Sequence, residues 1–133
     1  MRIKMWEKGL PVPHLQADIL DHHGIFIGRP DFFYPEYSVG VEYDGEGKYR
    51  GQYGITPEEA AISEMQRTKQ FGNAGIWLIR ITAQTLNDGS WIRHLSQTLK
   101  QNRGKVFPAE QWRSAGLAWI PNQPRRPRGS TRK

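Results

Sequence analysis

Two acidic residues stand in short segments that otherwise favour β-strands: Asp31 in Arg-Pro-Asp-Phe-Phe-Tyr and Glu42 in Val-Gly-Val-Glu-Tyr-Asp. Pro35, between the two segments, suits the second position of a turn. If the loop spans residues 35–38, Tyr34 pairs with Val39. Asp31 then lies opposite Glu42, because 31 + 42 equals 34 + 39.

Residues opposite each other in an antiparallel pair share a face of the sheet, with Cβ atoms about 4.5 to 5.5 Å apart. Two carboxylates that close repel each other unless a cation lies between them. We therefore expect a hard divalent cation, Mg²⁺ or Mn²⁺, bound by Asp31, Glu42 and the main-chain carbonyl of Tyr43. The less specific alternative is that both acids are ordinary exposed side chains of an edge hairpin.

A metal of this kind can polarise a phosphodiester and activate a water molecule, and a nearby basic group should stabilise the developing charge. The candidates are Lys48, which follows the second strand, and Arg67 or Lys69 in a later helix. The glycine-rich loop from residue 44 to residue 54 adds charge and aromatic surface for contact with nucleic acid. The charged and aromatic residues of this loop are Lys48, Tyr49, Arg50 and Tyr53. The alternative for Tyr49 and Tyr53 is that they pack under the loop instead of stacking on bases.

The periodicity of the chain predicts the elements that position these residues. We expect a short helix over residues 2–8 and strands over residues 14–20, 25–33, 39–43 and 76–82, with helices over residues 57–71 and 90–101. Pro30 favours an edge position or a bulge in the second strand. Trp112, Leu117, Trp119 and Ile120 should fold back on the body. The order predicts an α/β domain around one mixed sheet.

The helix over residues 57–71 has the clearest signals. Thr56 is a hydroxyl cap, Pro57 takes the first helical position and Glu59 completes a capping box. Glu64 and Arg67, three residues apart, share one face of this helix, either as part of the site or as a local ion pair.

Composition and charge restrict the function further. The chain has 133 residues and no cysteine, so a metal must be held without thiolates. Its formal charge is +6, yet the 13 acidic residues and 13 of the 19 basic ones lie at or before residue 110. The sequence contains no apolar stretch long enough to span a membrane and no secretory leader, which predicts a cytoplasmic protein.

The excess of positive charge lies near the C-terminus. We expect residues 1–120 to form one domain and residues 121–133 to be a disordered basic tail that contacts DNA, through arginines that include Arg125, Arg126 and Arg128. The alternatives are a tail that only aids solubility and a tail that docks on an acidic partner protein. His22 and His23 are expected in a solvated turn, with proton transfer near the site as the alternative.

Several segments together resemble the PD-(D/E)XK nuclease superfamily, and within it the branch similar to very-short-patch-repair endonucleases. They are Pro30-Asp31, the segment Val41-Glu42-Tyr43-Asp44-Gly45, the helix with Glu64 and Arg67, and the segment from Gly75 to Thr82. The similarity covers about residues 10–86. It implies a restriction-endonuclease-like αβββαβ core and a magnesium-dependent endonuclease acting on DNA. Asp31 and Glu42 match the metal ligands, and Glu64 and Arg67 match the helix pair.

The sequence also departs from the pattern of the superfamily. Asp44 stands where the superfamily has its catalytic lysine, with a turn-forming role as the alternative, and Lys48-Tyr49 stands where the branch has a histidine. Met65 replaces an expected lysine, and the first helix is reduced to residues 1–8, where Glu7 is the substitute acid. A homodimer or a partner protein could complete that helix. These departures keep open an inactive nuclease fold that acts as a DNA-binding or assembly module.

Overall fold

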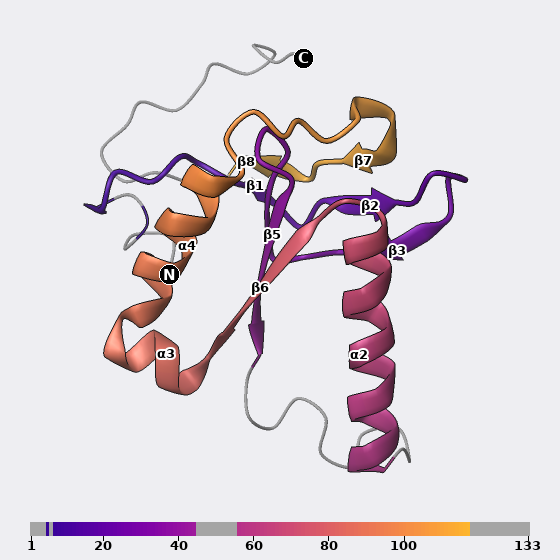
Figure 1. The fold of residues 1–133 in the computed structure, drawn as a ribbon, viewed down its shortest axis with the longest axis horizontal. Helices are drawn as coiled ribbons and strands as arrows, with labels where there is room; N and C mark the ends of the chain where they lie inside the picture. Colours follow the sequence, from indigo (N-terminus) through magenta and orange to yellow (C-terminus); the bar gives the residue numbers. More distant parts are fainter. Residues whose placement is uncertain (1–4, 6, 45–55, 118–133) are drawn as a thin grey trace.

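The computed structural model describes residue 5, residues 7–44 and residues 56–117, with the side chain of Asp44 excepted. Within this part the protein is an α/β fold of two sheets and three α-helices (Figure 1). The strands are β1 (His14–Leu15), β2 (Asp18–Leu20), β3 (Phe26–Gly28), β4 (Phe32–Tyr34), β5 (Val39–Asp44), β6 (Trp77–Thr82), β7 (Trp112–Arg113) and β8 (Gly116–Leu117). The helices are α2 (Pro57–Asn73), α3 (Ala83–Asp88), α4 (Ser90–Gln101) and the short 3-10 helix η2 (Ala109–Gln111).

The larger sheet is mixed and has five strands in the order β6-β5-β4-β1-β8. All its neighbours are antiparallel except β5 and β6, which run parallel. The pair β4–β5 has Tyr34 opposite Val39 and Phe32 opposite Val41, so the predicted register is confirmed. Asp31 directly precedes β4 and Glu42 directly follows Val41, so both acids lie next to the last recorded pair, Phe32 with Val41.

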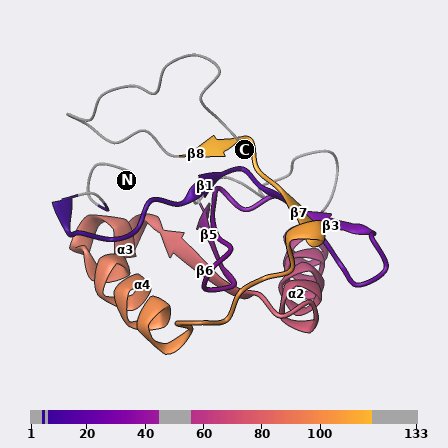
Figure 2. The ribbon, with the colours of Figure 1, turned by 90° about the horizontal axis from the view of Figure 1, so that it is seen from above.

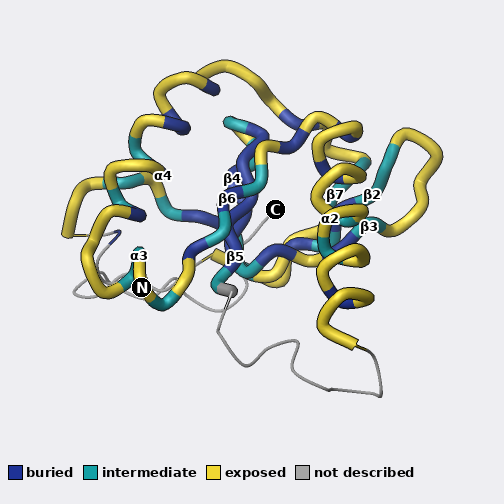
Figure 3. The backbone as a smooth tube through the Cα atoms, turned by 60° about the horizontal axis from the view of Figure 1, so that its bottom comes forward, coloured by how far each residue is buried: buried dark blue, intermediate teal, exposed yellow. Residues whose placement is uncertain are grey.

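Helix α2 connects the parallel strands β5 and β6, and it lies on the opposite side of the sheet from α3 and α4 (Figure 2). One core cluster contains Val41, Ile79 and the α4 residue Leu95, whereas the other contains Phe33 and the α2 residue Phe71. The alternation of side chains along each strand therefore separates two apolar layers, one under each helix layer. Figure 3 shows the central strands buried and the outer faces of the helices exposed.

The start of α2 follows the signals of the sequence. The side chain of Thr56 accepts a hydrogen bond from the N–H of Glu59, and the Glu59 side chain accepts one from the N–H of Thr56. Pro57 is the first helical residue, and the predicted capping box is confirmed. This cap satisfies main-chain N–H groups at the first turn and fixes the residue at which α2 begins.

Two strands that were predicted as continuous are each divided into two shorter strands. The prediction of a single sheet was also wrong, because the strands form two sheets. The segment over residues 14–20 breaks at Gln16, whose positive φ of 45° turns the chain out of β1 and into β2. The segment over residues 25–33 breaks around Pro30, between β3 and β4. Strands β2 and β3 then form a separate antiparallel sheet with β7, in the order β3-β2-β7. Pro30 lacks a ladder donor, which explains the second break.

The remaining predictions have mixed outcomes. Helix α4 and strand β6 agree closely with their predicted ranges, whereas α3 was missed. Trp112 and Leu117 fold back as expected, in β7 and β8, while Trp119 and Ile120 lie outside the described residues. Of the short first helix, Met5 and Glu7 are helical, and Met5 is buried in the core. Among the described residues, no helix is long and apolar enough to cross a membrane.

Candidate functional site

Glu42 lies in a cluster of two carboxylates and two guanidinium groups between the sheet and α2. Both Glu42 oxygens accept hydrogen bonds from Arg67, from Nη1 at 2.9 Å and from Nη2. Nη1 of Arg67 also donates to Oε1 of Glu64 at 3.2 Å. Arg80 donates through Nη2 to the same Glu64 oxygen at 2.5 Å, and its Nη1 lies 3.6 Å from Oε1 of Glu42.

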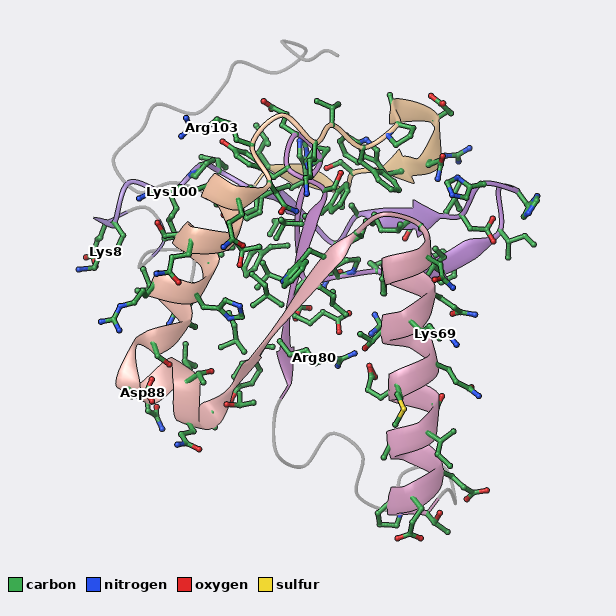
Figure 4. The ribbon with its side chains drawn as sticks, in the orientation of Figure 1. Lys8, Lys69, Arg80, Asp88, Lys100 and Arg103 are labelled. Carbon is green, nitrogen blue, oxygen red and sulfur yellow. The ribbon has the colours of Figure 1, made fainter. Side chains whose placement is uncertain are left out.

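The topology explains why these four residues meet. The parallel register of β5 and β6 sets Glu42 beside Arg80, and both side chains lie on the face covered by α2. Glu64 and Arg67 are three residues apart on α2, so they face the same side of the helix. In Figure 4, Arg80 extends from β6 toward α2.

Gly28 of β3 allows the close approach of Arg67. A Cβ atom at residue 28 would lie 2.9 Å from Cζ of Phe71, 3.0 Å from Nε of Arg67 and 3.1 Å from its Nη2. The Arg67 guanidinium also stands 5.1 Å from the ring centre of Phe71, within the range of a cation–π contact. Strand β3, Phe71 and Glu42 therefore hold the guanidinium from three sides.

The charges of this cluster balance, with two acids against two arginines. The Glu42 side chain is only 4% exposed, so its charge needs a close partner. Hydrogen bonding to Glu42 raises the pKa of Arg67 above its ordinary value, against the opposing effect of burial. Nη1 of Arg80 is buried without a hydrogen bond among the described residues, although it lies within ion-pair distance of Glu42.

Asp31 has different partners from Glu42. Its Oδ2 accepts the N–H of Tyr43 at 2.9 Å, and its main-chain oxygen accepts the N–H of Gln16 at 3.0 Å. Together with Leu15, Phe32 and Tyr43, Asp31 lines an open, mainly apolar pocket of about 570 Å³, which we call the Asp31 pocket. Its complete lining is Leu15, Gln16, Asp31, Phe32, Tyr43, Leu86 and Ala115.

The structure thus brings some of the predicted site residues together and leaves others undescribed. Glu42, Glu64 and Arg67 are in contact, and Asp31 bonds to the residue that follows Glu42. Asp44 is the last residue of β5, and nothing is described of its side chain. Lys48, Tyr49, Arg50, Tyr53, Arg125, Arg126 and Arg128 lie outside the described residues.

Arg80 is a member of the cluster to which the sequence analysis gave no role. The sequence did contain a signal, because Arg80 is the one charged residue in the apolar segment Trp77-Leu78-Ile79-Arg80-Ile81. A charge in a strand of this kind needs a partner on a neighbouring element. Gln16 and Leu86 of the Asp31 pocket were missed as well, since their positions depend on the turn at Gln16 and on α3.

The carboxylate oxygens of Asp31 and Glu42 are ligands of the kind that hard cations such as Mg²⁺ prefer. Each carboxylate oxygen has two lone pairs, so Glu42 keeps one on each oxygen besides those used by Arg67. Oδ1 of Asp31 makes no hydrogen bond within the described part of the chain. Among the described residues, no group of three or more histidine or acidic side chains is positioned to hold a metal ion. A metal bound by Asp31 and Glu42 would therefore need a main-chain oxygen, water or substrate as further ligands.

Comparison with known proteins adds no assignment. No protein-family model, no curated protein and no solved structure matches the chain. The function must therefore be inferred from the geometry of the site.

Proposed function

We propose that this protein is a metal-dependent endonuclease that hydrolyses phosphodiester bonds of DNA at Asp31 and Glu42. The observation on which the proposal rests is the hydrogen bond from the N–H of Tyr43 to Oδ2 of Asp31, which ties this carboxylate to the residue next to Glu42, at the end of the β4–β5 pair. A bound Mg²⁺ or Mn²⁺ would polarise the phosphate and activate water. The residues to hold it are Asp31, Glu42 and the main-chain carbonyl of Tyr43.

The order of elements supports the finer assignment of the fold. In the five-stranded sheet the chain forms β1, β4 and β5, crosses through α2 and returns as β6. This is the βββαβ order that the resemblance to the PD-(D/E)XK superfamily implies. Under this assignment, the short first helix is the part of the αβββαβ core that is reduced.

The arginine–acid cluster has two tasks in this proposal. Arg67 and Arg80 place positive charge beside the buried carboxylate of Glu42 and hold it between β5 and α2. Glu64 contacts both arginines and so fixes their direction relative to β5 and β6. Asp31 is held by the N–H of Tyr43, which leaves its other oxygen available.

Nicking of supercoiled plasmid in Mg²⁺ or Mn²⁺ tests the proposal. The variants are Asp31→Asn and Glu42→Gln, which keep side-chain size, and Glu36→Gln is a matched control because Glu36 is an exposed acid. We expect nicking by the wild type and by the control, and loss of nicking in both site variants. Circular dichroism establishes that each variant is folded. Equal nicking by all four proteins would exclude the proposed site.

One observation favours a second candidate, an inactive nuclease fold that binds DNA. Both Glu42 oxygens already accept hydrogen bonds from a guanidinium, which a metal ion would have to share or displace. Calorimetric titration with Mn²⁺ separates the two candidates. Saturable binding that Asp31→Asn removes supports the enzyme, whereas DNA binding without metal uptake supports the module.

A further inference from the structure

A group of cationic side chains without recorded ion pairs lies on the α4 side of the described part of the protein. A depression of about 870 Å³ is lined by the cationic side chains of Lys8, Arg93 and Lys100. We call it the α4 groove, and its other lining residues include Leu86, Trp91 and Gln97. Figure 4 shows Lys8, Lys100 and Arg103 gathered on this side of the molecule, away from α2.

These cations differ from those near Glu42 in having no acidic partners among the described residues. Arg67 and Arg80 are paired with Glu42 and Glu64. Within the part of the chain that the structure describes, Lys8, Arg93 and Lys100 form no ion pair. The groove lining contains one acid, Asp88, so its formal charge is 3 − 1 = +2. The Asp88 carboxylate is already engaged, since it accepts the N–H of Ser90 at the start of α4.

The cations are spaced along one face of a regular helix. Arg93, Gln97 and Lys100 follow the i, i+4, i+7 pattern of a single helical face, and all three are exposed. Arg93 and Lys100 are seven residues apart, which corresponds to about 10.5 Å along the axis. Each strand of a DNA duplex carries one phosphate per about 3.4 Å of helix axis, so for a helix lying along the duplex axis this distance corresponds to a rise of about three nucleotides.

The α4 groove adjoins the Asp31 pocket. Leu86 of α3 lines both depressions, so the two depressions meet at this side chain. A chain of phosphates that begins near Asp31 can therefore pass Leu86 and reach Arg93 and Lys100. The apolar walls of the Asp31 pocket, which include Phe32 and Tyr43, offer surface for a base on the same path.

We propose that the α4 groove is the track for the phosphate backbone of the DNA substrate, leading to the carboxylate of Asp31 past Leu86. This inference rests on the proposed endonuclease function for the identity of the ligand. It adds a binding surface made of other residues than those of the arginine tail and of the loop after β5. The continuity with the Asp31 pocket favours DNA over an acidic protein or a lipid surface.

The salt dependence of DNA binding tests the groove. Fluorescence anisotropy of a short labelled duplex, in EDTA and over a range of salt concentrations, gives the slope of log K against log salt for the full chain. Arg93→Gln and Lys100→Gln each remove one cation of the groove. Arg113→Gln is the matched control, because Arg113 is exposed on β7, outside the groove lining, and its loss changes the net charge equally.

Each phosphate contact contributes about 0.9 to the magnitude of the slope. We expect each groove variant to bind more weakly and to lower that magnitude by about 0.9, and the double variant to lower it by about twice as much. The control should keep the slope of the wild type. Equal slopes in all these proteins would overturn the inference. It would also be overturned if the groove variants lost binding to polyglutamate, or to vesicles containing phosphatidylserine, as strongly as they lose binding to DNA.

The two proposals fail in different ways. Binding in EDTA requires no hydrolysis, so it reports the groove alone, whereas plasmid nicking reports Asp31 and Glu42. If the groove variants had wild-type slopes and nicking depended on Asp31, the DNA track in the α4 groove would be rejected and the endonuclease proposal would stand. Reduced slopes, together with nicking that ignores Asp31→Asn and Glu42→Gln, would keep the groove as a DNA-binding surface and reject the active site.

Discussion

The carboxylate of Glu42 accepts hydrogen bonds from both terminal nitrogens of Arg67, and this pair joins β5 to α2. A two-point contact between a guanidinium and a carboxylate fixes direction as well as distance. Because Glu42 is buried and Arg67 partly buried, the pair contributes to the fold, and Arg67 occupies the carboxylate oxygens that a metal ion would bind. Two measurements separate these contributions.

Replacement of Arg67 should destabilise the protein. Arg67→Met leaves Glu42 buried with only the more distant Arg80, and breaking a buried pair in this way costs about 3 kcal/mol. Urea denaturation measures the free energy of unfolding. Arg29→Met is the control, because the Arg29–Asp18 pair is exposed and its loss should leave the urea midpoint unchanged. Equal midpoints for Arg67→Met and the wild type would contradict the structural role of the pair.

Metal affinity should respond in opposite directions to changes in Arg67 and Glu64. Arg67 competes with a cation for Glu42, so Arg67→Met should bind Mn²⁺ more tightly than the wild type. Glu64 offers Nη1 of Arg67 a second acceptor at 3.2 Å, so Glu64→Gln should leave Arg67 more firmly on Glu42 and weaken Mn²⁺ binding. Electron paramagnetic resonance of free Mn²⁺ gives both affinities.

The outcomes of this titration also separate competition from positioning. If Arg67 mainly orients Glu42 for the metal, both substitutions should weaken binding. A change of the same sign in the two variants would therefore reject competition. Arg29→Met serves again as the control that should leave the affinity unchanged, since Arg29 is paired with Asp18.

The sequence predicted the parts of the fold that depend on local rules. The register of Tyr34 with Val39 followed from the length of one turn, and the capping box at Thr56 followed from three residue types. The contact of Glu64 with Arg67 followed from helical spacing. Each of these depends on residues a few positions apart, where backbone geometry leaves few alternatives.

The parts that were missed depend on long-range contacts. The positive φ of Gln16 is unusual for a residue other than glycine, and it moves the chain from one sheet to the other. The partners of Arg80 come from β5 and α2, which lie far from it in the chain. The α4 groove combines Lys8 with α4 residues across more than 80 positions, so charge patterning along the sequence could not reveal it.

Gly28 should be required because a larger side chain would not fit. Its φ is not positive, so backbone conformation does not demand a glycine at this position. In Gly28→Ala the new Cβ would meet the Phe71 ring at 2.9 Å and the Arg67 guanidinium at 3.0 Å, so the ring or the guanidinium must move. We expect a loss of about 1 to 3 kcal/mol in the free energy of unfolding. Gly72→Ala, near the end of α2 with nothing within 4 Å of the new Cβ, should be neutral or stabilising. Equal effects of the two substitutions would show that Gly28 is not in close contact.

His14 should make folding stability depend on pH. Burial lowers the pKa of His14 below 6.5, with a smaller opposing effect of Glu36. The ring lies beside Trp112, with 4.8 Å between centroids, and its Nδ1 is 2.8 Å from the Ser114 hydroxyl. Because the unfolded chain takes up a proton more readily, His14 contributes its stability above pH 6.5, and this contribution falls as the pH decreases through the lowered pKa. Urea midpoints measured from pH 8 to pH 5 should fall toward acid in the wild type and fall less in His14→Gln. His94→Gln, at an exposed position of α4, is the control and should show the same pH dependence of the urea midpoint as the wild type. If His14→Gln also showed the pH dependence of the wild type, the effect would belong to other groups.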